Sequence, residues 1–423
     1  MSYLSKVIIT NVEASYIETF LKQKGIARTD EEQGQELVFW GGKLIDKHKI
    51  DVEEFENFLF DELFWGKRKN IRIYKLEKVS KIKYPKDWLE PLEEKYKISS
   101  LNFNNILDTI VDQNNPIRIV AIHSEVNFKG ELVRIRILFS LYIQVNGDGG
   151  YVDSGTYIPV EIDFAKKNMI IKGWNRQQIS HEDNKVGAQM EHIKKLMNMQ
   201  FGVRTLNYET EHKKVLYAMS RHLIYDVYSN IPTFNQVDDL EELVKKFVQD
   251  IYQQLALKNV YIDEMTGESS IPEGVMDFES EIKNTIEGLA ISDHFYSRNF
   301  DEIWKMGLEA VVAKVKFNDR ERVLTSLNGE NNDIPIFCTK TFMTLKKRME
   351  ESKKIETLWI AMDRKKGNLN LKFEATNPEY LEVMIRYGIR FNESDMNSAL
   401  EIYEKYESEL INQITTKGEI AVS

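Results

Sequence analysis

Opposite charges are separated into two adjacent segments near the N-terminus. Between Asp51 and Glu62 the chain carries six acidic residues and no basic one, whereas Lys67–Lys86 carries nine Lys or Arg residues and one acid, Glu77. Cations at this density hold phosphate groups or acidic side chains, and aromatic rings among them offer faces on which a base can stack. The predicted contact residues, for nucleic acid or an acidic protein partner, are Trp65, Lys67, Arg68, Lys69, Arg72, Tyr74, Lys75, Lys78, Lys81, Lys83 and Tyr84.

Two other interpretations of the same stretch stay open. Lysines on an edge strand block unwanted strand pairing, and the acidic segment beside them could simply neutralise them. Alternatively, the acidic segment is itself the contact surface and docks a basic partner. If residues 71–76 form a strand, Arg72 and Tyr74 share one face while Ile71 and Ile73 point to the core.

A pair of carboxylates could carry metal-dependent hydrolysis. Glu161 and Asp163 stand at i and i+2, so on a strand they project from the same face, where acids can hold a divalent ion. No Glu-x-Lys pattern follows them in register. Arg134 and Arg136 lie on the polar face of a neighbouring predicted strand, and cross-strand pairing with these acids explains the pattern equally well.

The histidines and the single cysteine predict no metal site. Four of the seven histidines fall within 42 residues, at separations of eleven, twenty and ten, and ligands on one helix need i, i+3 or i, i+4 spacing. These four are His181, His192, His212 and His222. Cys338 alone excludes an internal disulfide framework and a multi-cysteine zinc site, and its apolar surroundings are typical of a buried thiol.

Familiar catalytic and cofactor motifs are missing from the chain. Gly147–Gly150 lacks the Lys-Ser/Thr ending of a phosphate-binding loop and fits a hairpin turn. The sequence also has no Gly-x-Ser-x-Gly elbow, His-Glu-x-x-His run or kinase signature. We therefore expect no cofactor, and a non-enzymatic role is favoured over an enzymatic one.

The composition limits how the protein could contact nucleic acid. The 423 residues include 57 basic and 67 acidic ones, for a net charge of −10, so a general coat for nucleic acid is excluded and a contact must be a local patch. Short, charge-interrupted apolar runs and an N-terminus unlike a signal peptide predict a soluble, cytoplasmic protein without membrane contact. Abundant Lys, Ile, Asn and Glu resemble the composition of low-GC bacterial proteins.

Hydrophobic periodicity predicts the elements that must position these residues. Every second residue from Val133 to Val145 is apolar, which is typical of a long half-buried strand, and Asn146–Gly150 then predicts a hairpin turn. Other expected strands are residues 7–10, 37–40, 71–74, 82–84, 157–164, 169–174, 358–363 and 369–373. Expected helices are residues 51–64, 87–97, 277–291, 300–315, 339–352 and 394–412, with apolar helical stripes at 186–197, 216–227 and 240–255.

These elements predict an α+β fold: an antiparallel β meander with a helical subdomain, flanked by an N-terminal α/β unit and a C-terminal α+β unit. The expected domains are residues 1–100, 101–262 and 277–423, with a linker at 263–276. The expected function is a non-enzymatic binding or assembly component of an intracellular, bacterial complex, with antiviral defence as one setting. It would contact nucleic acid or an acidic partner through the basic-aromatic stretch. The alternative is a metal-dependent hydrolase or nuclease that uses Glu161 and Asp163.

Overall fold

The computed structural model divides the chain into two compact units. The first comprises Met1–His212 and Lys372–Glu401, and the second comprises Lys213–Leu371 and Ile402–Ser423, which differs from the three expected ranges. The structure describes residues 4–29, 32–255, 257, 259–262, 269–272, 275–295, 303, 305–318, 324–328, 335–338, 340–363, 368–386 and 390–420.

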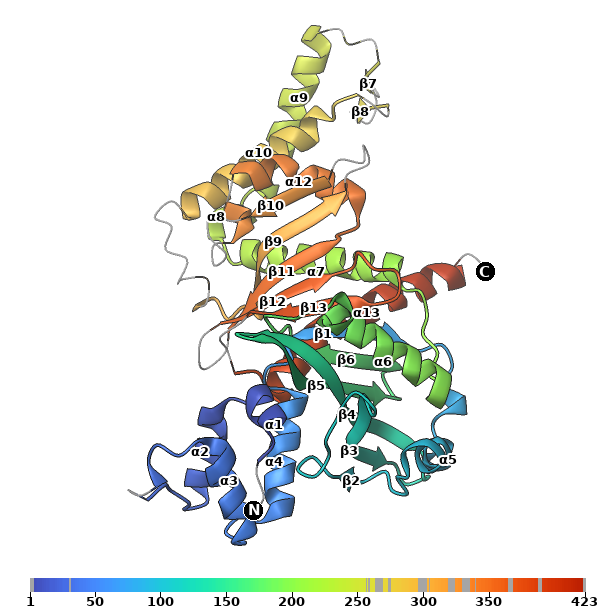
Figure 1. Cartoon of the computed structure of the whole chain (residues 1–423). Helices are drawn as coiled ribbons and strands as arrows, with labels where there is room; N and C mark the ends of the chain where they lie inside the picture. Colours follow the sequence, from blue (N-terminus) through green and yellow to red (C-terminus); the bar gives the residue numbers. More distant parts are fainter. Residues whose placement is uncertain are drawn as a thin grey trace. The chain divides into compact units, whose positions relative to one another are not determined.

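Helices and strands are both abundant in the first unit (Figure 1). Its helices are α1 (Lys6–Asn11), α2 (Ala14–Gln23), α3 (Leu37–Asp46), α4 (Val52–Phe64), α5 (Pro85–Tyr96) and α6 (Val186–Phe201). Its strands are β1 (Asn70–Lys75), β2 (Phe103–Asn104), β3 (Ile117–Val126), β4 (Leu132–Gly147), β5 (Gly150–Asp163), β6 (Asn168–Gly173) and β13 (Leu381–Ile385). Short 3-10 turns are η2 (Val79–Lys81) and η3 (Glu182–Asn184).

The second unit also mixes helices and strands. Its helices are α8 (Pro232–Asn235), α9 (Glu241–Leu255), α10 (Phe278–His294) and α12 (Lys340–Ser352), with 3-10 turns η4 (Asp238–Leu240) and η5 (Ile336–Cys338). Its strands are β7 (Tyr261–Ile262), β8 (Ser269–Ser270), β9 (Ala310–Asn318), β10 (Leu324–Asn328) and β11 (Thr357–Met362). Three elements contain a division point between the units: α7 (Glu209–Ser229), β12 (Leu369–Glu374) and α13 (Glu393–Ile420).

The predicted α+β class is confirmed. The described strands form an antiparallel sheet of eleven strands, and β7 and β8 pair separately. Within the first unit the order is β13-β1-β6-β5-β4-β3-β2, and within the second it is β10-β9-β11. Because β1 lies between β13 and β6, the basic stretch enters the middle of a sheet and not its edge.

The predicted meander is present with its hairpins. β4 pairs with β5 from Arg134–Asp163 to Gly147–Gly150, and β5 pairs with β6 across the second turn. Apolar residues on one face of these strands pack against α5 and α6, where Trp88 and Met197 are fully buried. The meander was expected to have one covered face, but the other face is covered as well, because α1 and α4 pack on β5 and β4.

Four predicted elements are wrong. Residues 7–10 belong to α1, whose first turn is capped by the Ser5 hydroxyl accepting from Val7 N–H, and residues 37–40 begin α3. Four-residue apolar runs fit either a strand or one helical turn, so periodicity alone does not separate them. Residues 82–84 follow η2 and form no strand, since Pro85 begins α5. Residues 310–318 form β9, although a helix was expected over 300–315.

The buried face of helix α9 overlaps only in part with the stripe that the sequence predicts. Val244, Val248 and Tyr252 are its buried residues and pack near α10. Val244 belongs to the expected stripe, whereas Phe247 and Leu255, also in that stripe, are more than half exposed. The two apolar stripes lie on neighbouring faces, and the sequence does not say which one meets α10. The expected linker at 263–276 lies mostly outside the described residues.

Candidate functional site

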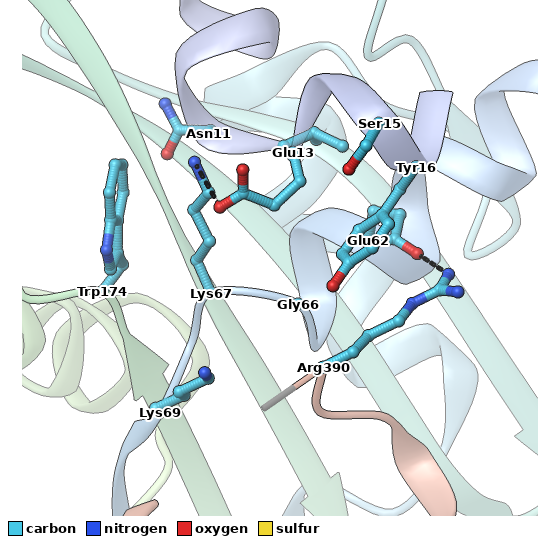
Figure 2. A pocket seen from close by; sticks show the side chains of 11 residues that line it. Asn11, Glu13, Ser15, Tyr16, Glu62, Gly66, Lys67, Lys69, Trp174 and Arg390 are labelled. Carbon is cyan, nitrogen blue, oxygen red and sulfur yellow. Dashed lines mark hydrogen bonds and ion pairs between the residues drawn. The ribbon is translucent and has the colours of Figure 1, made fainter. Parts of the chain in front are cut away.

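A pocket of about 350 Å³ in the first unit gathers cations, carboxylates and rings from four separate segments (Figure 2). Two of its cations, Lys67 and Lys69, come from the predicted basic stretch, and the third, Arg390, precedes α13. Pockets of this size accommodate small ligands or single groups of larger ones. The lining residues are Asn11, Val12, Glu13, Ser15, Tyr16, Glu62, Gly66, Lys67, Lys69, Trp174 and Arg390.

A tight turn between α4 and β1 presents the two lysines. Arg68 N–H donates to the Trp65 carbonyl at 2.8 Å, and Lys69 N–H donates to the Lys67 carbonyl at 3.0 Å. Lys67 and Lys69 consequently line the pocket, while Arg68 between them is fully buried. Of the three consecutive cations in this turn, Lys67 and Lys69 therefore line the pocket, whereas Arg68 lies in the core beneath it.

Gly66 makes this turn possible, because a Cβ at that position would lie 2.4 Å from the Glu62 carbonyl oxygen. We expect Gly66→Ala to force the turn apart and to lower the free energy of unfolding by about 1–3 kcal/mol. Urea unfolding measures this loss. Gly149→Ala is the matched control, since nothing lies within 4 Å of its Cβ position; equal stability of both variants would contradict the assignment.

Two of the three pocket cations, Lys67 and Arg390, are already paired with an acid and a ring. Lys67 Nζ lies 3.2 Å from Glu13 and 4.7 Å from the centroid of the Trp174 ring. Arg390 forms an ion pair with Glu62, and its guanidinium lies 4.3 Å from the centroid of the Tyr16 ring. Figure 2 shows both ion pairs among the side chains that line the pocket. With three cations and two carboxylates, the lining has a formal charge of +1.

Burial sets Lys69 apart from the other two cations. Only 8% of Lys69 is exposed, and burial lowers the pKa of its amine, an effect that Glu13 partly offsets. An anionic ligand that enters the pocket would favour the charged form of this amine.

Three predicted contact residues lie in the core instead of on a surface. Trp65 is 5% exposed, and Arg68 and Tyr74 are fully buried. Arg68 donates to the Asn11 carbonyl at 2.8 Å and to Asn11 Oδ1 at 2.7 Å. Both hydrogen bonds connect its guanidinium to the end of α1. The expectation that these three contact a partner is therefore corrected: they support the fold.

The remaining predicted residues do not join the pocket. Arg72 donates to the Gly187 carbonyl at 3.1 Å and lies over the Tyr380 ring. Lys75 lies over the Tyr208 ring, and Lys83 is paired with Glu131. Among the rest, Lys78, Lys81 and Tyr84 are exposed beyond the end of β1. The stretch is thus divided among several environments, and only its beginning enters the pocket.

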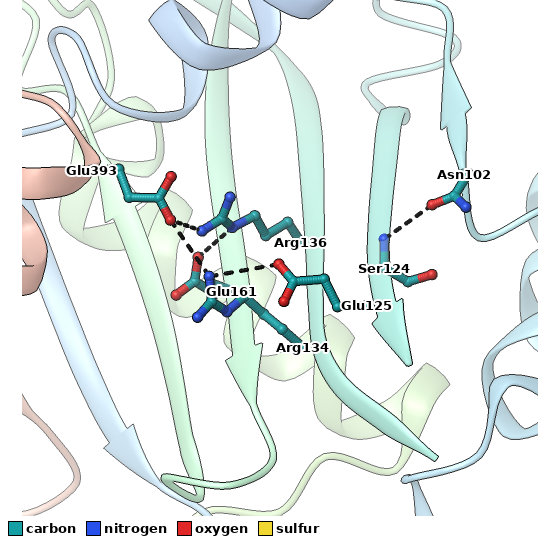
Figure 3. Close-up of polar contacts among 7 residues, drawn as sticks. All are labelled: Asn102, Ser124, Glu125, Arg134, Arg136, Glu161 and Glu393. Atoms are coloured by element: carbon teal, nitrogen blue, oxygen red, sulfur yellow. Dashed lines mark hydrogen bonds and ion pairs between the residues drawn. The ribbon is translucent and has the colours of Figure 1, made fainter. Parts of the chain in front are cut away.

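The strand carboxylates are engaged in an ion-pair network (Figure 3). Glu161 accepts from Arg136 Nε at 2.6 Å, across the β4–β5 register that the sequence left open. Glu393 also forms an ion pair with Arg136, and Arg134 Nη1 lies 3.4 Å from Glu393 Oε1. Asp163 accepts from Lys166 N–H at 2.9 Å and so closes the β5–β6 turn. Both carboxylates of the alternative, metal-dependent hydrolase are thus engaged in contacts within the fold.

We expect Glu161→Gln to weaken this network and to lower the free energy of unfolding by about 1–2 kcal/mol at pH 7. Burial raises the pKa of Glu161, but Lys172 and Arg136 outweigh burial, and the net pKa is lowered below 4.5. Its stabilising effect is therefore complete above pH 4.5 and disappears as the pH falls through the folded-state pKa. Urea unfolding from pH 7 to pH 3 should show the two proteins converging; a gap that is constant with pH would contradict this.

The histidines do not assemble into a metal centre. Among the described residues, no group of three His, Cys, Asp or Glu side chains could hold a metal ion. His212 is fully buried against the Tyr208 ring, and burial lowers its pKa to about 3. His181, His192 and His222 are exposed. The side chain of Cys338 and the environment expected for it lie outside the described residues.

Several residues that line the pocket could not be predicted from the sequence. Tyr16, Trp174 and Arg390 are far apart in the chain and come together through the packing of α2, β6 and the segment before α13. Trp174 is the last residue of the expected strand 169–174 and directly follows β6 in the structure. Glu13 and Glu62 limit the pocket's positive charge, an effect that the density of lysines alone does not indicate.

No described helix has the length and apolar character needed to cross a membrane. No protein-family model matches this chain, and no curated protein matches it significantly.

Proposed function

We propose that this protein is a non-enzymatic binding component of a larger complex and that the pocket of its first unit holds a single-stranded nucleic acid. The observation that carries the proposal is the meeting of Lys67, Lys69 and Arg390 with the Trp174 and Tyr16 rings in one pocket. Cations bind the phosphates of a single strand, and rings stack on its bases. The pocket volume of about 350 Å³ fits one nucleotide.

Single strands are favoured over a duplex by the shape of this site. A pocket admits one splayed nucleotide, whereas a duplex needs a broad surface that follows two backbones. The formal charge of +1 at the pocket and −10 for the whole chain predicts modest affinity. Such a component would act beside other subunits that add contacts.

A substitution at Trp174 distinguishes the two candidate ligands, a nucleic acid and an acidic protein. We expect Trp174→Ala to weaken binding of a labelled single-stranded oligonucleotide by about tenfold, because stacking contributes ~1–3 kcal/mol per base. An acidic peptide bound by charge alone would lose much less. Fluorescence anisotropy measures both probes, and Tyr151→Ala, a change of an exposed aromatic residue outside the pocket lining, is the control.

Salt dependence provides the second measurement. Three cations predict a slope of about −2 for the logarithm of affinity against the logarithm of salt concentration, at ~0.7 per phosphate contact on a single strand. Failure of the wild-type protein to bind any oligonucleotide, or a slope near zero, would overturn the proposal. If an acidic peptide binds more tightly than the oligonucleotide, the ligand of the pocket is an acidic protein and not a nucleic acid.

The alternative, a metal-dependent hydrolase, has no comparable support. Its two carboxylates are committed to Arg136 and to the Lys166 amide. Binding tests on the basic stretch must leave Arg68 in place, because its side chain is fully buried and its loss would damage the fold.

A further inference from the structure

Helix α9 in the second unit has two apolar rows, and only one of them is buried. The buried row packs near α10 and consists of Val244, Val248 and Tyr252. The other, exposed row lies one residue earlier along the chain and consists of Leu243, Phe247 and Ile251, with Leu240 and Leu255 at its ends. Leu243 is 66% exposed, Phe247 51% and Leu255 63%. A continuous row of large exposed apolar side chains on one helix marks a contact with another molecule.

The exposed row is nearly symmetric about Phe247. Leu243 and Ile251 each lie four residues from it, and Leu240 and Leu255 lie seven and eight residues from it. A two-fold axis that crosses the helix beside Phe247 therefore places the row against a reversed copy of itself. Each apolar side chain of the row then meets an apolar side chain of the second copy, and the two Phe247 rings meet near the axis.

The charges beside the exposed row have the same symmetry. Glu242, Lys246 and Asp250 form a row on the side of the helix away from α10. All three are exposed, and Lys246 and Asp250 have no ion-pair partner in the described part of the chain. In the antiparallel pair, Lys246 faces Asp250 of the second copy, and this contact occurs twice. Glu242 faces Gln253 of the second copy, so the charged row opposes no like charges.

Other arrangements and other partners fit this face less well. In a parallel pair, the charged row of one copy would face the row of the second copy that already packs near α10. A polyanion such as a nucleic acid would meet Glu242 and Asp250 on either side of Lys246, so the charged row lacks the positive charge that such a ligand needs. A second copy is the partner that matches both the apolar spacing and the order of the charges.

We infer that α9 pairs two copies of this chain, antiparallel and face to face around Phe247. The contact lies in the second unit, so it does not depend on the pocket at Lys67. The helix has 15 residues and is ~22 Å long at about 1.5 Å per residue. One such pair of helices gives an interface near the lower limit of about 1,200 Å² for stable complexes. We therefore expect a reversible dimer with a Kd of ~1–100 μM.

Sedimentation equilibrium of the full chain over a series of concentrations tests this inference. We expect the average mass to rise with concentration from that of a monomer toward that of a dimer. Phe247→Gln removes both central rings from the dimer and should raise the Kd by about tenfold or more. Tyr225→Gln is the matched control and should leave the Kd unchanged, because Tyr225 is a 61% exposed aromatic residue of α7 outside this face.

A charge exchange tests the antiparallel register. Lys246→Asp and Asp250→Lys each place like charges opposite one another twice, so each variant alone should dimerise about tenfold more weakly at low salt. In an equimolar mixture of the two variants, positions 246 and 250 again carry opposite charges across the interface. We expect the mixture to dimerise with about the wild-type Kd. Circular dichroism checks that the variants fold.

The inference would be overturned by a wild type that stays monomeric about tenfold above the expected Kd range, which would assign the exposed row to a different protein. A dimer that Phe247→Gln leaves unchanged, or a mixture that dimerises no more tightly than either charge variant alone, would overturn it as well. The wild-type measurement needs no variant, so misfolding cannot leave the question open. Phe247→Gln should bind a short oligonucleotide as the wild type does; failure of both proteins to bind it would count against the pocket and not against α9.

Discussion

Replacing Arg68 with alanine is expected to lower the free energy of unfolding by about 3–5 kcal/mol. The guanidinium is fully buried and donates two hydrogen bonds to Asn11, at 2.8 and 2.7 Å. It also lies 5.9 Å from the centroid of the Tyr157 ring. Alanine would leave both Asn11 oxygens without this donor and a cavity where the side chain lay. Asn11 in turn donates to the Gly155 carbonyl, so the loss would extend to the packing of α1 on β5.

Lys67→Ala is the matched control for this prediction. Lys67 is the preceding residue in the same turn, but it lines a pocket and is partly exposed. Its exposed ion pair contributes little, and we expect a loss below about 1 kcal/mol. Urea unfolding of the wild type, Arg68→Ala and Lys67→Ala measures these losses in the free energy of unfolding. If Arg68→Ala and Lys67→Ala lose similar stability, Arg68 does not connect the N-terminal helices to the sheet.

Replacing Lys172 with methionine is expected to stabilise the protein at pH 7 by about 1–3 kcal/mol, because a buried amine without a hydrogen-bond acceptor is costly and Glu161 keeps its ion pair with Arg136. The amine is completely buried, its Nζ lies 3.1 Å from the centroid of the Trp65 ring and 3.9 Å from that of Phe64, and no described residue accepts a hydrogen bond from it. Burial lowers its pKa well below 10.5, an effect that Glu161 opposes. Methionine has a similar length and packs well on rings without the cost of a buried amine.

The pH dependence of this gain identifies its cause. Between the folded-state pKa and 10.5 the unfolded protein binds the additional proton, so the stability of the wild type rises with pH, by at most ~1.4 kcal/mol per unit. The advantage of Lys172→Met should therefore be small near pH 10.5 and should grow as the pH falls toward 7. Lys166→Met, at an exposed turn position, should show no such trend. A Lys172→Met protein less stable than the wild type at every pH would contradict this account.

Long periodic segments could be predicted from the sequence, and short ones could not. Thirteen alternating residues on β4 and the acidic run of α4 each repeat often enough to fix the type of element. Residues 7–10 and 37–40 are single apolar turns; the first is capped by Ser5, and the helical state of both depends on packing against neighbouring elements. In α9 the helix was predicted, but its inward face depends on α10.

The candidate site shows the same division between local and tertiary information. The density of lysines after Gly66 located one wall of the pocket. Charge density cannot reveal that Arg68 turns inward between Lys67 and Lys69, because that depends on the turn and on the Asn11 acceptors. Trp174 and Arg390 join the pocket only through tertiary packing, and the sequence offers no local spacing that connects them with Lys67.

Binding of a single-stranded oligonucleotide by Lys67→Gln and Glu13→Gln is the most direct test of the pocket. Both changes remove the same ion pair, so any damage to the fold is shared, but one removes a cation and the other an anion. We predict that Lys67→Gln weakens binding severalfold and Glu13→Gln strengthens it severalfold, as measured by fluorescence anisotropy at low salt. Changes in the same direction, or no change in either variant, would contradict the proposal that this pocket holds a polyanion.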